Sequence, residues 1–143
     1  MAQGGMQAEE QTRIAVDFVS RVGTGGIDEH HYAPDLTAWS PLMGMITREQ
    51  YLPKLSSVKE VWKVPLAVTV DSVTAQPGRV AVQARSHGVL IDGQEYGNTY
   101  LFLIEFNDAG QIRHVREYFN PDPVREILQP VVFRWREENG VSA

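Results

Sequence analysis

Residues 80–123 read VAVQARSHGVLIDGQEYGNTYLFLIEFNDAGQIRHVREYFNPDP. The segment holds three runs in which apolar and polar residues alternate, the pattern of half-buried β-strands. Two turn signals, IDG at residues 91–93 and NDAG at residues 107–110, separate the runs. The segment therefore predicts three successive strands joined by hairpin-like turns.

Helical patterns precede this segment, and one more strand leads into it. Apolar residues recur at helical spacing within residues 7–22, and TREQ at residues 47–50 has the form of a capping box that opens a short helix. Alternation from Trp62 predicts a fourth long strand, with a bulge near Asp71 and Ser72 where its phase shifts. Helices followed by hairpin-linked strands indicate an α+β fold, in which a strongly curved, mainly antiparallel sheet wraps around N-terminal helices.

Composition restricts the classes of partner. The net charge of −5 disfavours a nucleic-acid ligand, which would need a basic surface. No run approaches the roughly 18 consecutive apolar residues of a membrane span. The chain has no cysteine, which excludes disulfides and thiolate catalysis, and its first residues lack the basic and apolar regions of a secretory signal. We expect a cytoplasmic protein with neither nucleic acid nor membrane as partner.

A length of 143 residues fits one domain with a substantial core. We expect a disordered tail over residues 1–8, a folded domain over residues 9–128 and a C-terminal extension over residues 129–143. Residues 123–138 are too apolar for a free tail. The extension is therefore predicted to pack on the domain or on a second subunit.

Three ionisable side chains interrupt the apolar runs of residues 80–123, namely Arg85, His87 and Glu117. Charged groups are seldom buried unless they are paired or needed for chemistry. Arg85 and His87 share a strand face, because side chains two positions apart point the same way, and we expect that face to form a pocket wall. Glu117 lies between Val115 and Phe119 on its own face, so it should either pair with a cation or have a raised pKa. A buried Arg85–Glu117 ion pair and a chemical role in a pocket both remain open.

The other face of the strand that begins at Arg79 carries small apolar side chains, from Val80 to Leu90. Such a flat face suits packing against another sheet or a second subunit. Elsewhere, several aromatic, methionine and polar residues are candidates for a substrate cavity, although core packing is the simpler explanation for any one of the apolar ones. These candidates are Trp39, Ser40, Met43, Met45, Tyr96, Tyr100, Phe102 and Phe119.

No cofactor or metal is expected. None of the histidine pairs has the spacing of a zinc-binding motif, and zinc needs three or four converging ligands. The chain also lacks the Rossmann glycine pattern, the Walker motif and the Gly-x-Ser-x-Gly nucleophile motif.

Two segments resemble SnoaL-like proteins of the nuclear-transport-factor-2-like superfamily, which includes ketosteroid isomerase and limonene epoxide hydrolase. They are YAPD at residues 32–35 and GQIRHVREYFNPDPV at residues 110–124, and the resemblance covers residues 10–128. It implies a cone-shaped fold with a deep apolar pocket for a hydrophobic small molecule. It also implies a homodimer formed through the outer face of the sheet.

The resemblance assigns positions to particular activities. Ketosteroid isomerase has its aspartate base directly before a proline, where this chain has Ser40, so steroid isomerisation by that mechanism is disfavoured. Limonene epoxide hydrolase has an Arg and an Asp two residues apart and a further Asp in the last strand. At the corresponding positions this chain keeps the arginine as Arg85, but has His87 in place of the first Asp and Glu117 in place of the second. Members that act in phenazine biosynthesis have an acid/base glutamate in an Arg-Glu-Phe segment, similar to the residues around Glu117.

We therefore expect a SnoaL-like enzyme that uses general acid/base chemistry without a cofactor on a hydrophobic cyclic metabolite. The reaction would be an isomerisation, a cyclisation, a dehydration or an epoxide hydrolysis. Glu117 would be the acid or base, His87 a second proton carrier, and Arg85 a group that orients Glu117 or stabilises an oxyanion. The alternative is a non-catalytic module of the same fold that binds a small ligand or a protein partner.

Overall fold

The computed structural model describes residues 2–141 of the chain, and side chains from residue 7 onward. The helices are α1 (Ala2–Arg21), α2 (Arg48–Val58), α3 (Pro121–Pro123) and α4 (Gln129–Glu138), with one-turn 3₁₀ helices at Glu29–His31 and Lys59–Val61 and a π-helical turn at Val124–Leu128. The strands are β1 (Tyr32–Ser40), β2 (Gly44–Thr47), β3 (Trp62–Gln76), β4 (Arg79–Leu90), β5 (Glu95–Phe106) and β6 (Ile112–Phe119). The sequence pattern predicted that the first helix starts at residue 7, but α1 begins earlier, at Ala2.

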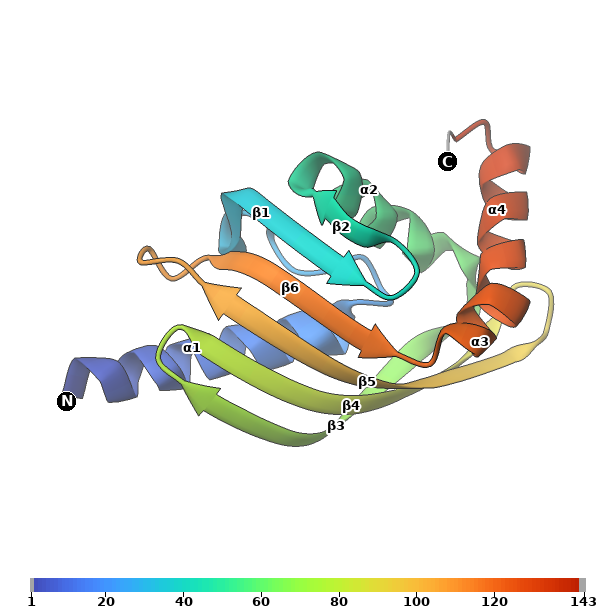
Figure 1. The fold of residues 1–143 in the computed structure, drawn as a ribbon. Helices are drawn as coiled ribbons and strands as arrows, with labels where there is room; N and C mark the ends of the chain where they lie inside the picture. The colour runs from blue at the N-terminus through green and yellow to red at the C-terminus, as the bar shows by residue number, and fades with distance from the viewer. Residues whose placement is uncertain (1, 142–143) are drawn as a thin grey trace.

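All six strands belong to one open sheet, in the order β2-β1-β6-β5-β4-β3 (Figure 1). The pairings are antiparallel except for β1 with β6, which is parallel. The register of β3 against β4 shifts between Val70 and Ser72, at the predicted bulge. Figure 1 shows a curved sheet with α1 and α2 on one side of it. The predicted α+β fold, a curved and mainly antiparallel sheet with N-terminal helices, is confirmed.

The small apolar side chains of β4 lie on the inner face of the sheet, the face that α1 covers. Val80 and Val82 are fully buried in the same core as Phe18 of α1. The prediction that this face would meet another sheet or subunit is therefore wrong. Its small side chains let α1 lie close to the strands, whereas the larger polar side chains of β4 point to the opposite side.

Phe18 is at the centre of the core. Its ring makes edge-to-face contacts with Phe102 and with Tyr32, each with a centroid separation of 6.1 Å. Edge-to-face aromatic pairs add to the free energy gained from burial alone. These contacts join α1 to β5 and to the start of β1, so helix and sheet share one core.

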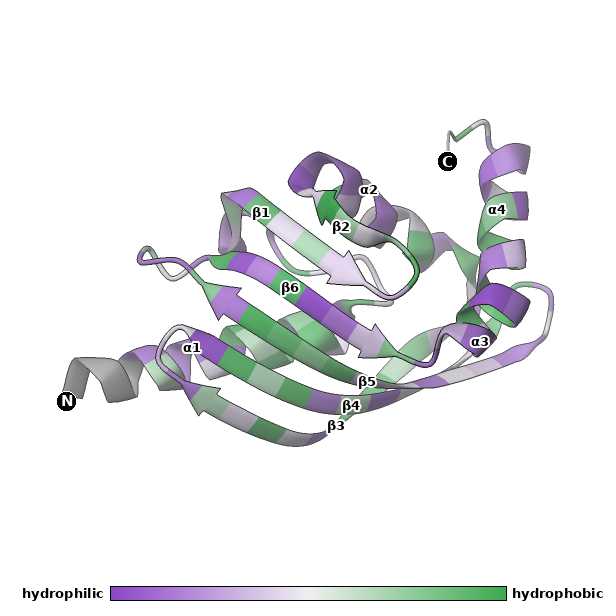
Figure 2. Ribbon diagram, in the orientation of Figure 1, coloured by the Kyte–Doolittle hydropathy of each residue, from purple (hydrophilic) through white to green (hydrophobic). Residues whose placement is uncertain are grey.

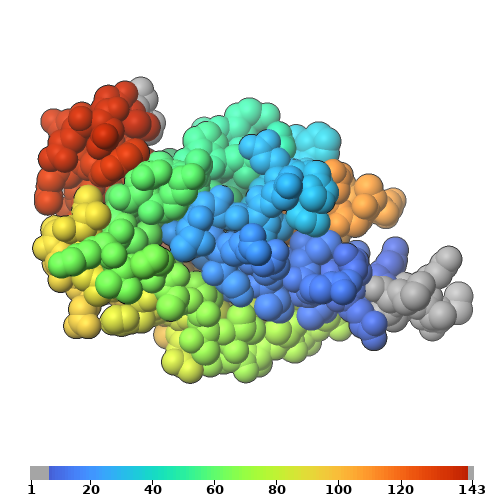
Figure 3. All heavy atoms as spheres, turned by 180° about the vertical axis from the view of Figure 1, so that it is seen from behind, coloured from blue at the N-terminus to red at the C-terminus, as the bar shows by residue number. Residues whose placement is uncertain are grey.

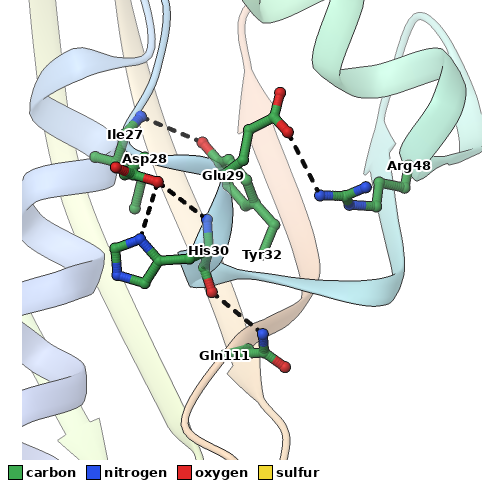
Figure 4. Close-up of polar contacts among 7 residues, drawn as sticks. All are labelled: Ile27, Asp28, Glu29, His30, Tyr32, Arg48 and Gln111. Carbon is green, nitrogen blue, oxygen red and sulfur yellow. Dashed lines mark hydrogen bonds and ion pairs between the residues drawn. The ribbon is translucent and has the colours of Figure 1, made fainter.

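A short turn fixes the start of β1 (Figure 4). The carboxylate of Asp28 accepts a hydrogen bond from the backbone N–H of His30, and the hydroxyl of Tyr32 accepts one from the backbone N–H of Ile27. The carbonyl of His30 accepts a hydrogen bond from the side-chain amide of Gln111, at 3.2 Å. The entry to β1 is thereby tied to the β5–β6 turn, which places β1 beside β6.

The C-terminal helices pack on the same chain, at the end of the sheet where β6 finishes. Val131 and Val132 of α4 are buried in a second apolar cluster with Val61, Leu66 and Leu90. Figure 3 shows α4 against the segments around the start of β3 and the β4–β5 turn. Polar and apolar residues alternate along α4 in Figure 2, as expected for a helix with one buried side. No helix within residues 2–141 combines the length and apolar character needed to cross a bilayer.

Replacement of Phe102 by Ala should lower the free energy of unfolding by about 3–5 kcal/mol, because it removes a fully buried ring and leaves a cavity against Phe18. Chemical denaturation monitored by circular dichroism measures the change. The matched control is Thr69→Ala, at an exposed position of β3, which should cost less than about 1 kcal/mol. Equal losses for the two variants would contradict the assignment of the core.

Candidate active site

A cavity of about 410 Å³ lies between the helices and the inner face of the sheet. Its wall is mostly apolar, which is typical of sites for hydrophobic small molecules. The lining comes from the end of α1, from α2, from the start of β3, from β5 and β6, and from the C-terminal helices. The lining residues are Val22, Gly23, Met43, Tyr51, Lys54, Leu55, Val58, Trp62, Leu66, Tyr96, Tyr100, Glu117, Phe119, Val124, Leu128, Gln129, Val132, Phe133 and Arg136.

Glu117 is the only acidic residue in this lining. Strand alternation directs Val115, Glu117 and Phe119 to the inner face of β6, and Glu117 reaches the cavity near the end of the strand. Protein surrounds the carboxyl group, although part of the side chain is open to the cavity. Within the described part of the chain, its carboxylate has neither a hydrogen-bond donor nor a cation as partner. Burial alone raises the pKa of Glu117 to about 7.

Two hydrogen-bond donors in the cavity wall are also unpartnered. The hydroxyl of Tyr51 and the indole N–H of Trp62 are buried and bond to no other described residue. Burial raises the pKa of the Tyr51 hydroxyl, and the charge of Glu117 raises it further, which places the phenol close enough to sense the carboxylate. Unpaired buried donors cost free energy, so both groups are suited to bonding an oxygen atom of a bound molecule.

Two further tyrosines in the wall are held in place by hydrogen bonds. The hydroxyl of Tyr100 lies 2.8 Å from the hydroxyl of Ser86, and the hydroxyl of Tyr96 accepts a hydrogen bond from Asn98 at 3.1 Å. Asn98 also bonds the backbone N–H and carbonyl of Asn120, just after β6. Burial raises the pKa of both tyrosines, which keeps their hydroxyls neutral. They therefore form a rigid, uncharged wall beside Glu117.

Arg85 and His87 do not line the cavity, and the prediction that they share a wall with Glu117 is wrong. Both side chains are exposed on the outer face of β4. Arg85 pairs with Asp71 at 3.2 Å, and His87 lies 3.3 Å from the carboxylate of Glu95. The buried Arg85–Glu117 ion pair is likewise absent. Strand alternation correctly predicted that Arg85 and His87 share one face of β4. That face is the outer one, because α1 packs against the opposite face.

The remaining predicted residues divide into two groups. Met43, Tyr96, Tyr100 and Phe119 line the cavity together with Glu117. The other four do not. Trp39 contacts the exposed ring of Tyr118 on the outer face, and Met45 is exposed. Ser40 accepts a hydrogen bond from the Met43 backbone N–H, and Phe102 is in the core.

Sequence reasoning missed the contributions of α2 and α4. Tyr51 and Leu55 stand four residues apart on α2, and this spacing indicates that the helix turns one face inward. The apolar residues of the C-terminal segment were recognised, but nothing in the sequence connects them to Glu117. No group of three or more histidine or acidic side chains converges as a metal site within the described residues.

The same fold occurs in solved structures of several enzymes, whereas no protein-family model and no curated protein matches the sequence. A protein from Jannaschia sp. CCS1 described as a SnoaL-like polyketide cyclase is similar, with 18% identity, 83% of this chain and 91% of that one covered, and a TM-score of 0.69. The BvnE pinacolase of Penicillium brevicompactum has 15% identity, coverage of 85% and 90%, and a TM-score of 0.70. An LEH-like epoxide hydrolase of M. tuberculosis has 15% identity, coverage of 89% and 92%, and a TM-score of 0.64. The predicted SnoaL-like, nuclear-transport-factor-2-like fold is thus confirmed.

Replacement of Glu117 by Gln should change how stability depends on pH. A carboxyl whose pKa rises on folding stabilises the native state only while it is protonated, so this contribution is lost as the pH rises from about 4.5 to about 7. Relative to Glu117→Gln, the wild type should lose roughly 1–3 kcal/mol of unfolding free energy across this interval. Denaturant titrations at several pH values measure the difference.

The control for this measurement is Glu60→Gln, which makes the same chemical change at an exposed position. It should leave the pH dependence of the wild type unchanged. A wild-type profile that runs parallel to that of Glu117→Gln would contradict the raised pKa.

Proposed function

We propose that this protein is a small-molecule enzyme that uses general acid/base chemistry without a cofactor on a hydrophobic cyclic metabolite. The observation that carries the proposal is Glu117, an unpaired carboxyl with a pKa of about 7 in a largely apolar cavity. A general acid or base is most effective when its pKa is close to the working pH. Structural ion pairing, the common alternative reason for a buried carboxylate, does not apply to Glu117 in the described structure.

The chemistry follows from the groups in the wall. The ionised Glu117 takes a proton from a carbon or a water molecule, and the resulting carboxylic acid returns that proton to a second position on the substrate. The hydroxyl of Tyr51 donates a hydrogen bond to the substrate oxygen on which negative charge develops, and the indole N–H of Trp62 is a second donor. Arg85 and His87 take no part, because their side chains lie outside the cavity.

The structural neighbours support this class of reaction. Their names describe a polyketide cyclase, a pinacolase and an epoxide hydrolase, all of which act on small organic molecules. Isomerisation, cyclisation, dehydration and epoxide hydrolysis all need a proton to be moved at a defined atom. The position of Glu117 supports that shared step, and the shape of the cavity would determine which substrate undergoes it.

We also propose a homodimer formed through the outer face of the sheet. Trp39, Met45, Leu101 and Tyr118 place apolar surface on this face, and Met45 is more than half exposed. The rings of Trp39 and Tyr118 contact each other, with their centroids 5.0 Å apart and their planes tilted by 49°. A cluster of exposed aromatic and methionine side chains is characteristic of protein interfaces.

Glu117→Gln should reduce turnover about 10²–10⁴-fold, because the amide cannot transfer the proton. The substrate is to be sought by mass spectrometry of molecules retained by the purified protein, followed by assays with terpenoid epoxides, aromatic polyketides and related cyclic compounds. Tyr51→Phe should lower the turnover number about 10²-fold with a smaller effect on KM, since it removes a donor to the transition state.

The control, Glu60→Gln, should retain wild-type turnover. Undiminished turnover in a folded Glu117→Gln protein would refute the acid/base assignment. Tight binding of a retained compound that is never converted would instead favour a ligand-binding module.

The variant Leu101→Asp/Tyr118→Asp should be monomeric under conditions in which the wild type is dimeric, because it places charges in the apolar patch. Sedimentation equilibrium at micromolar concentrations gives the mass. The control is Ile91→Asp, at an exposed apolar residue in the β4–β5 turn, which should remain dimeric. A monomeric wild type would contradict the proposed interface.

A further inference from the structure

Two cations stand where the cavity opens to the surface. Lys54 of α2 and Arg136 of α4 both line the cavity that contains Glu117. Both also line an adjoining groove of about 520 Å³, together with Met43. Their shared position in the two hollows places Lys54 and Arg136 at the mouth.

Neither cation has an acidic partner among the described residues. Six of the nine other arginines are paired with carboxylates of described residues, as Arg85 is with Asp71 and Arg125 with Asp122. Arg136 instead donates a hydrogen bond to the hydroxyl of Ser57 at 3.0 Å.

The acidic residue of the adjoining groove does not neutralise these cations. Glu49 lines the groove, but among the described residues it forms no ion pair with Lys54 or with Arg136. The chain as a whole has 18 acidic and 13 basic residues, so two unpaired cations at one opening are not a consequence of excess basic residues.

The two charges are close enough to affect each other. Burial lowers the pKa of Lys54, and the charge of Arg136 lowers it further. Both side chains are half-buried, which strengthens their interaction with a ligand compared with fully exposed cations. An anion between them would relieve this repulsion and accept charge-assisted hydrogen bonds from both.

The interior of the cavity, in contrast to its mouth, disfavours an anionic group. Apart from the two cations at the mouth, the only charged residue of its lining is the acidic Glu117, and most of the other lining residues are apolar, so an anionic group placed beside Glu117 would lose hydration and be repelled. A ligand with an apolar ring system and one negative group can meet both conditions in only one orientation. Its rings enter the cavity and its anionic group remains at the mouth.

We propose that Lys54 and Arg136 bind the carboxylate of the substrate, so that the substrate is a hydrophobic cyclic carboxylic acid. This inference rests on the proposed function, since it names the class of molecule that the Glu117 cavity takes. The two cations are positioning residues, because they hold the end of the molecule remote from the reacting atoms. They also orient the ring system towards Glu117.

The test compares 2-naphthoate with 2-naphthamide, two ligands of nearly equal shape of which only the first is charged. Isothermal titration calorimetry should give wild-type affinity at least about tenfold higher for the carboxylate. Lys54→Met and Arg136→Met should each reduce this preference, and the double variant should abolish it while leaving the affinity for the amide within about threefold of wild type.

Two control variants separate the effect of charge from an effect on folding. Lys63→Met removes a cation at an exposed position of β3 and should leave the preference unchanged. Lys54→Arg keeps the charge and should keep the preference, even if Lys54→Met proves poorly folded. Any of three results would overturn the inference. The folded double variant could retain the preference, the wild type could bind the two ligands with equal affinity, or it could fail to bind naphthoate at millimolar concentration.

Glu117→Gln distinguishes this inference from the proposed function. A carboxylate at the mouth predicts that the variant keeps the preference for naphthoate over naphthamide. A large gain in naphthoate affinity in this variant would place the carboxylate beside residue 117 and overturn the inference. Loss of turnover with an unchanged binding preference would support both proposals, whereas unchanged turnover with the same preference would refute only the role of Glu117.

Discussion

The contact of α1 with the inner face of the sheet determines where a cavity can exist. Phe18 fills the space above Phe102, and Val80 and Val82 close in beside it, so this part of the inner face is a packed core. The end of α1 at Arg21 leaves the rest of that face uncovered. There α2 and the C-terminal helices line one side of the cavity that contains Glu117, and β5 and β6 line the other.

The cavity lowers the free energy of unfolding of the empty protein, because polar groups in its wall have no partners. Glu117 has no partner among the described residues, and the Tyr51 hydroxyl and the Trp62 indole N–H have none either. Each such group lowers the stability of the empty protein, since its bonds to water are lost on folding without replacement. Departures from good packing and pairing of this kind concentrate at functional sites, where a ligand supplies the missing partners.

Local patterns in the sequence were sufficient to predict the four long strands β3 to β6, the capping box at residues 47–50, the β3 bulge and the inward direction of Glu117. They did not predict the short strand β2. They failed for Arg85 and His87 for a physical reason. Alternation divides a strand into two faces but is symmetric between them, and only the packing of α1 decides which face is inside. A small flat face such as Val80 to Leu90 fits a close helix as well as a second subunit. Tyr51 and Arg136 come together with Glu117 only through contacts between distant parts of the chain, which no local pattern contains.

The C-terminal helix α4 has a role that its apolar residues alone did not indicate. Val131 and Val132 attach it to the second apolar cluster, and that attachment holds Arg136 at the opening. The helix thus closes the cavity and gives its opening a positive charge. Burial keeps the pKa of Glu117 raised only while no cation lies beside its carboxylate, because such a cation would return the pKa towards its usual value. Cations that bind an anionic substrate must therefore lie away from Glu117, and the half-buried mouth formed by α2 and α4 meets that requirement.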